Sequence, residues 1–152
     1  MIVNPNSLAT LKTQWQGVVQ MRDRIRNLVV STFALDVRKS PIFGDIFYNL
    51  PYLLAFDVLK QVLIQASEEG QFTGSRGHLG DLMDSAKTSL QWVDWECLRD
   101  AVNRQSKVAL EGKLFGDVQC LYDIAVIETQ LIAWDIIAPV ELRLFSSAMS
   151  LS

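Results

Sequence analysis

The chain has 152 residues, the size of one ordinary domain, and 49% of them are hydrophobic, which is enough to form a core without metals or disulfides. Only four prolines and eight glycines occur, so the composition excludes an intrinsically disordered chain. The net charge of −3 is too close to neutral to indicate binding of nucleic acid over the whole surface. Residues 1–44 carry a local net charge of +4. This basic segment could steer an anionic partner, or it could simply be a solvated face.

A long first helix is predicted after Pro5, with Asn6 or Ser7 as its N-cap and its end at about Phe33 or Leu35. Hydrophobic residues recur along it at three- and four-residue steps, which place them on one helix face: Leu8, Leu11, Trp15, Val18, Ile25, Leu28 and Val29. Arg22 falls on this face, so its side chain either extends along the surface to water or is paired inside.

A second helix is predicted from near Asp45, strong from Pro51 onward because proline suits a first helical turn, and ending at Gly70. The glycine-containing segment 71–77 is predicted to be a loop. A third helix is expected over residues 79–92.

The fourth helix is predicted to be capped by Asp94, and the fifth to begin at an Asp117 cap and end at Pro139. The fifth is so widely apolar that we expect it either at the centre of the bundle or in a subunit interface. Its charged residues, Asp123 among them, argue against a membrane span, which needs about 20 mostly apolar residues.

No stretch alternates with the period of a β-strand. The sequence therefore predicts an all-α, antiparallel (up-and-down) bundle of about five helices, in one domain over residues 1–152, with residues 139–152 as a C-terminal tail or short docking helix. No signal peptide is visible, so we expect a cytoplasmic protein in which Cys97 and Cys120 are buried, reduced thiols.

Complete catalytic and metal-binding patterns are not found in the sequence, and we predict no metal and no cofactor. His78 is the sole histidine, so any histidine-dependent catalysis has to use it; alternatively it is a surface residue without a role. Trp92 and Trp95 could stack a ring or a base, or could close the end of the core.

The segment 98–112, LRDAVNRQSKVALEG, resembles the signature of HEPN-type helical domains, in which an arginine followed by a polar residue precedes a histidine by four to six positions. Arg104 matches the arginine, Gln105 or Ser106 the polar residue, and Leu110 stands where the family has its histidine. The resemblance implies a bundle of four or five helices, usually dimeric, with the motif beside the dimer cleft.

Active HEPN proteins are metal-independent ribonucleases. The resemblance implies that their arginine and histidine act together on the scissile phosphate. Arginine offers a planar fork of donors to phosphate oxygens, and histidine can move a proton near neutral pH. Leu110 can do neither. We therefore expect a pseudoenzyme in which Arg104, Gln105 and Ser106 bind phosphate or RNA, with His78 as an accessory residue.

The first hypothesis for function is a HEPN-like domain that has lost ribonuclease activity and binds RNA or a protein partner, as in defence or toxin–antitoxin type systems. The second is a homodimeric interaction or scaffold protein without a nucleic-acid role. The third is an enzyme of another type, with carboxylates, His78 or Arg104 in a pocket. A second Arg104 across a two-fold cleft favours the first hypothesis, whereas an Arg104 held by a carboxylate favours the second.

Overall fold

The computed structural model describes residues 3–34, 48–74, 77–111 and 116–139. These residues form α-helices and no strand, which confirms the all-α prediction for the described part of the chain; the helices are α1 (Pro5–Ala34), α2 (Asn49–Glu68), α3 (Leu79–Ala86), α4 (Trp95–Glu111) and α5 (Asp117–Ala133). The predicted helix start near Asp45, the predicted tail over residues 140–152 and the side chain of Leu110 lie outside the described residues.

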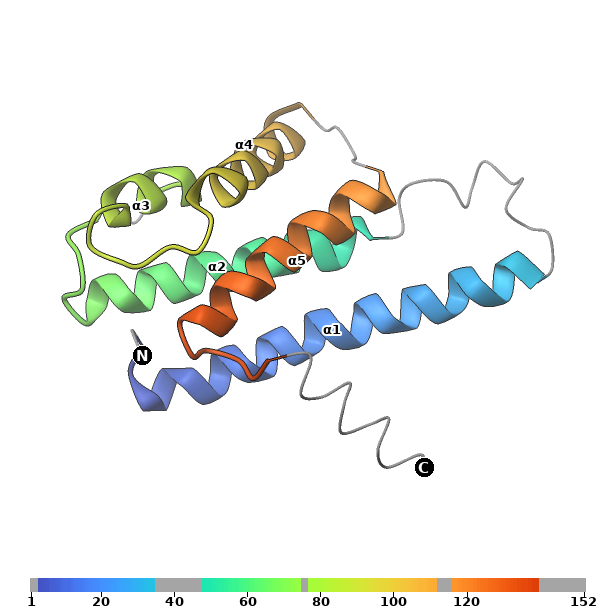
Figure 1. The fold of residues 1–152 in the computed structure, drawn as a ribbon, viewed down its shortest axis with the longest axis horizontal. Coiled ribbons are helices and arrows are strands. Elements are labelled where there is room, and N and C mark those ends of the chain that lie inside the picture. The colour runs from blue at the N-terminus through green and yellow to red at the C-terminus, as the bar shows by residue number, and fades with distance from the viewer. Residues whose placement is uncertain (1–2, 35–47, 75–76, 112–115, 140–152) are drawn as a thin grey trace.

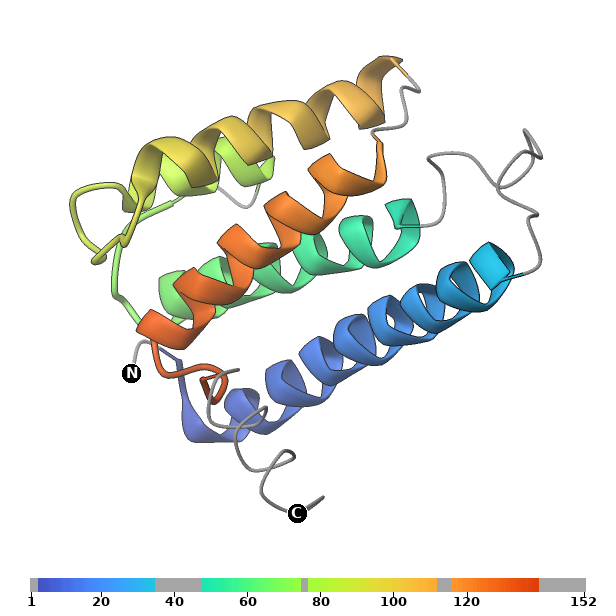
Figure 2. The same ribbon diagram turned by 45° about the vertical axis from the view of Figure 1, so that its right-hand side comes forward.

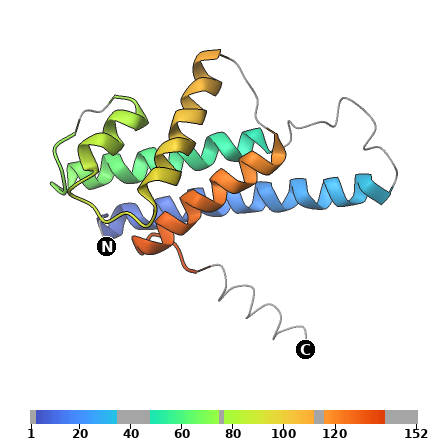
Figure 3. The same ribbon diagram turned by 45° about the horizontal axis from the view of Figure 1, so that its top comes forward.

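The centre of the bundle is α2, which packs against all four other helices. Figure 1 shows α5 lying across α2, with α1 on one side of this pair and with α3 and α4 on the other, and Figure 2 shows the same order from a second direction. In Figure 3, α4 rises steeply from α2. The sequence offered the centre of the bundle or a subunit interface as places for the fifth helix. In the structure α5 packs against α2 and α4 and keeps one side exposed.

Helix ends differ from the prediction at four places. Gly116 rather than Asp117 is the N-cap of α5. Asn4 rather than Asn6 or Ser7 caps α1, since its Oδ1 accepts a hydrogen bond from the amide of Asn6 at 2.8 Å. Pro5 is then the first helical residue, where its missing N–H costs nothing. The predicted Asp94 cap is confirmed, because its Oδ1 accepts the amide of Cys97 at 3.1 Å.

The other two differences are early helix ends. The third helix stops at Ala86 rather than Trp92, because the chain turns to pack the Trp92 ring edge-to-face against Trp95 and Trp134, with 4.9 Å between ring centroids in each pair. The fifth stops at Ala133, and Asp135 then adopts a positive φ of 60°. The tryptophans therefore close the end of the core.

None of the described helices has the length and hydropathy needed to cross a membrane.

Candidate functional site

Arg104, the residue that resembles the HEPN arginine, lies on α4, and its side chain reaches α5. Its guanidinium binds the carboxylate of Asp123 through two hydrogen bonds, from Nη2 to Oδ1 at 2.7 Å and from Nε to Oδ2 at 3.2 Å. The Asp123 side chain is 0% exposed and that of Arg104 is 28% exposed. The Arg104 guanidinium, which we expected to bind a phosphate, therefore binds the buried carboxylate of Asp123.

Two more side chains complete this cluster around Asp123. The hydroxyl of Tyr52, on α2, donates to Oδ2 at 3.2 Å, and the side-chain amide of Gln119, one turn earlier on α5, donates to Oδ1 at 3.0 Å. Each carboxylate oxygen thus accepts two hydrogen bonds, and the cluster joins α2, α4 and α5. Burying a charge is costly unless it is paired and hydrogen-bonded, and this arrangement meets both conditions.

The pKa shifts of Tyr52 and Arg104 keep both groups protonated, as donors to the Asp123 carboxylate must be. Burial, followed by the nearby charge of Asp123, raises the pKa of Tyr52 far above its usual range, so that the phenol stays protonated as a donor. The hydrogen bond to Asp123 raises the pKa of Arg104, which keeps the guanidinium charged. The cluster has the properties of a structural ion pair that stabilises the packing of α4 against α5.

His78, Gln105 and Ser106, the other predicted site residues, line one groove between α2, the start of α3 and α4. The groove has a volume of about 560 Å³, within the range of about 300–1,000 Å³ typical of ligand sites. Lys60 and Arg99 also line it, together with the acids Asp57 and Asp81, so its charges nearly balance. The structure thus brings three of the predicted residues together and directs the Arg104 guanidinium to Asp123 instead.

Two groups of the groove are already engaged. The guanidinium of Arg99 binds Asp84 through Nε at 3.1 Å and Nη2 at 3.2 Å, and it also donates to Asn103. Ser106 donates its hydroxyl to the carbonyl of Val102 at 3.1 Å, within α4. Lys60, His78, Gln105 and the two acids, Asp57 and Asp81, are therefore the polar groups of the groove that remain to meet a ligand.

Glu128 is a second buried acid on α5, and it faces α1. Its Oε2 accepts a hydrogen bond from the indole Nε1 of Trp15 at 3.1 Å and lies 3.7 Å from Nη1 of Arg22, whose side chain is 15% exposed. The sequence allowed the Arg22 side chain either to extend to water or to be paired inside, and the structure shows it paired with Glu128. Both acids with described side chains on α5 therefore point inward.

The opposite side of α5 carries no charge among its described side chains. We call Val118, Tyr122, Ala125, Thr129 and Ala133 the α5 outer face; all five are exposed, with Val118 at 83% and Tyr122 at 51%. The partly exposed residues that flank it are also uncharged: Gln119, Leu121, Val126 and Ile132. A surface helix normally places its charges toward water and its apolar residues toward the core, so α5 is unusual in hiding its acids and exposing apolar groups.

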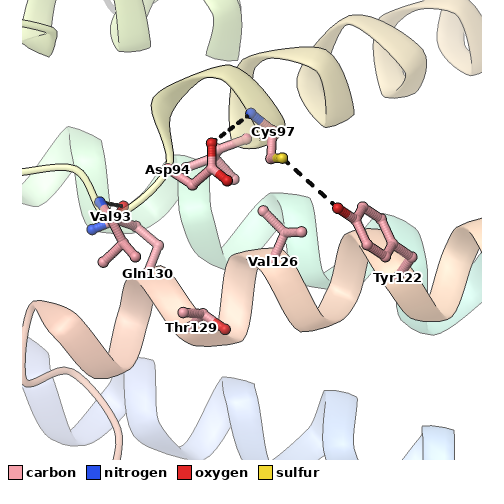
Figure 4. A pocket seen from close by; sticks show the side chains of 8 residues that line it. Val93, Asp94, Cys97, Tyr122, Val126, Thr129 and Gln130 are labelled. Atoms are coloured by element: carbon pink, nitrogen blue, oxygen red, sulfur yellow. Dashed lines mark hydrogen bonds between the residues drawn. The ribbon is translucent and has the colours of Figure 1, made fainter.

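A small hollow of about 190 Å³ adjoins the α5 outer face, where the start of α4 meets α5 (Figure 4). Val93, Cys97, Tyr122 and Val126 line it, and the Cys97 thiol lies 3.7 Å from the Tyr122 hydroxyl. A hydrogen bond with Asp94 raises the pKa of the Cys97 thiol, which keeps it protonated. Neither Cys97 nor Cys120 forms a disulfide, and Cys120 is buried as expected, whereas Cys97 is partly exposed at this hollow.

Asp123, Tyr52 and Gln119 are the residues of the Arg104 cluster that sequence reasoning did not identify as site residues. Asp123 was considered only as a charge that interrupts an apolar helix. The sequence did contain an indication of this pair, because an acid on an apolar helix face needs a cationic partner once that face is buried. Which cation it finds depends on how the helices pack.

The described residues contain no group of three or more His, Cys, Asp or Glu side chains that could hold a metal ion. Comparisons of the chain with protein-family models, with curated proteins and with solved structures found no match.

Proposed function

We propose that the protein is a helical interaction protein, which acts by binding a protein partner, and that Arg104 serves its stability. The observation that carries this proposal is the pair between Arg104 and the fully buried Asp123. A phosphate that recruited Arg104 would have to draw it away from a carboxylate that has no access to water. Leaving a buried charge without its partner costs about 3–5 kcal/mol, so a phosphate is a poor competitor for this arginine.

The α5 outer face supports a protein as the partner. Exposed apolar side chains without accompanying charges are typical of surfaces that are covered by another protein. The face holds two large exposed residues, Val118 and Tyr122, beside a hollow too small for an ordinary ligand.

The experiment measures cleavage and binding of a fluorescein-labelled single-stranded RNA at low salt, where phosphate contacts are strongest. We expect neither cleavage nor salt-dependent binding by the purified protein, in EDTA or with added Mg²⁺. Metal-independent cleavage that Arg104→Ala abolishes, in a variant that circular dichroism shows to be folded, would overturn the proposal.

RNA binding in the groove between α2, α3 and α4 is a second candidate function, favoured by the presence there of His78, Gln105 and Lys60. Its test is Lys60→Ala, with Lys12→Ala on the exposed side of α1 as the matched control. Binding that only Lys60→Ala weakens would support this candidate, whereas equal affinities for the two variants would remove it. The HEPN-like identity, the up-and-down order of the helices and the loss of ribonuclease activity remain predictions.

A further inference from the structure

The groove between α2, α3 and α4 contains charged groups of both signs that are not engaged elsewhere. Asp57, Lys60, His78 and Asp81 line it, and within the described part of the chain their side chains form no hydrogen bond or ion pair. His78 stands at the N-cap position of α3, yet its side chain makes no capping hydrogen bond. These four groups are therefore available to a ligand.

The face that α2 turns to the groove presents an apolar group, an acid and a base in succession. Leu53, Asp57 and Lys60 are spaced by four and three residues, so their side chains share one face of the helix over about 10 Å. Phe56 and Leu79 add apolar lining, and Leu53 is 40% exposed. The groove thus offers an apolar surface beside one position for a cationic group and one for an anionic group.

We propose that this groove binds a small zwitterion with an apolar body, of about the size of a dipeptide, whose ammonium group meets Asp57 and whose carboxylate meets Lys60. The volume of about 560 Å³ suits a molecule of this size. The two ends of an extended dipeptide lie about 7 Å apart, a separation that the flexible side chain of Lys60 can span from Asp57. The groove is separate from the α5 outer face, so this ligand is additional to the proposed protein partner.

Other classes of ligand complement the groove less well. RNA carries negative charge along its whole backbone, so Asp57 and Asp81 repel it. A simple cation is repelled by Lys60. An uncharged apolar molecule takes water away from the charged groups without replacing their hydrogen bonds. A zwitterion with an apolar body matches the acid, the base and the apolar lining together.

The first test is a titration of the isotopically labelled full chain with leucyl-phenylalanine, followed by amide-resolved NMR. We expect saturable shifts at the amides of Gly80 and Asn103, which line the groove, and none on the α5 outer face. The N-acetylated dipeptide lacks the ammonium group and the dipeptide amide lacks the carboxylate, so each should bind at least about tenfold more weakly. No saturable shift up to the solubility limit of the dipeptide, or equal binding of the three compounds, would overturn the inference.

The second test assigns the two charges. Asp57→Asn should weaken binding of the dipeptide at least about tenfold and leave the affinity of the N-acetylated form unchanged, because that form has no ammonium group to lose. Lys60→Gln should act in the same way on the dipeptide and its amide. Asp100→Asn and Lys12→Gln, at exposed positions outside the groove, are the matched controls and should bind like the wild type.

Two further outcomes would refute the proposed ligand. One is an equal loss for the dipeptide and its blocked forms in Asp57→Asn and Lys60→Gln, because it would show that neither charge is recognised. The other is a groove whose amides shift with single-stranded RNA and not with the dipeptide, because it would assign the groove to nucleic acid. Binding of a protein at the α5 outer face depends on neither result, so failure of this ligand and failure of the proposed protein partner can be told apart.

Discussion

The guanidinium of Arg104 meets the carboxylate of Asp123 through two hydrogen bonds, at 2.7 and 3.2 Å, across the contact between α4 and α5. Tyr52 from α2 donates to the same carboxylate. Three helices that are distant in sequence are thus joined at one buried charge. Arg104 is therefore part of the framework of the bundle, and we expect its replacement to lower the stability of the fold.

Replacing Arg104 should strongly destabilise the fold. Arg104→Ala leaves the Asp123 charge buried without its cation, and because Arg104 is partly exposed we expect the lower end of the usual range, a loss of about 3 kcal/mol in the free energy of unfolding. Urea denaturation monitored by circular dichroism measures it. Lys107→Ala, at an exposed position of the same helix, should change stability by less than about 0.5 kcal/mol. Equal stabilities of the two variants would show that the pair contributes little.

Tyr52 should make the fold sensitive to alkaline pH. Its pKa is raised in the folded state, so above the ordinary tyrosine pKa of about 10 the unfolded chain releases a proton that the folded chain retains. The free energy of unfolding should therefore be fully maintained below this pH and fall as pH rises above it. Tyr52→Phe should lose about 1.5 kcal/mol at neutral pH through its missing hydrogen bond to a charged group, and should show a weaker alkaline decline. Urea titrations at several alkaline pH values measure the difference, and parallel declines in the two proteins would contradict it.

Glu128 should hold α1 against α5 through Trp15 and Arg22. Glu128→Ala leaves the buried indole N–H and the partly buried Arg22 without this acceptor, and we expect a loss of about 2 kcal/mol. Glu96→Ala, at an exposed position in the first turn of α4, is the control and should remain within about 0.5 kcal/mol of the wild type. Differential scanning calorimetry measures both, and a Glu128→Ala protein as stable as Glu96→Ala would rule out this role.

Two glycines should respond oppositely to alanine. Gly17 lies in the middle of α1 with no atom within 4 Å of an added Cβ, so Gly17→Ala should stabilise the fold by about 0.5–1 kcal/mol through the entropy of the unfolded chain. Gly70 follows α2 with a positive φ of 76°, so Gly70→Ala should destabilise it by about 1 kcal/mol. Thermal unfolding of the two variants compares them directly, and shifts of the same sign would contradict the helix boundaries described.

The spacing of hydrophobic residues was sufficient to predict helices and most of their positions. Asp94 as a cap and Gly70 after α2 follow from local rules that act within a few residues. The early end of α3 could not be predicted, because it depends on Trp92 packing against Trp134, a residue of a distant segment.

The candidate site was predictable only in part. The motif led to Arg104, Gln105 and Ser106, and the structure places two of these with His78 along a groove. Successive residues of a helix point in different directions, however, so a sequence match does not say which of them faces a ligand. The partner of Arg104 comes from α5 and depends on how the helices cross, which no local pattern encodes.

The structural role of Arg104 is tested most directly by NMR of its guanidinium Nε–H group in the isotopically labelled full chain, during titration with single-stranded RNA. We expect one slowly exchanging Nε–H signal, assigned by its loss in Arg104→Lys, whose position does not change as RNA is added, because Asp123 holds the donor. A signal that exchanges rapidly with water and shifts progressively with RNA would show that Arg104 meets phosphate, and would refute its assignment to the framework of the bundle.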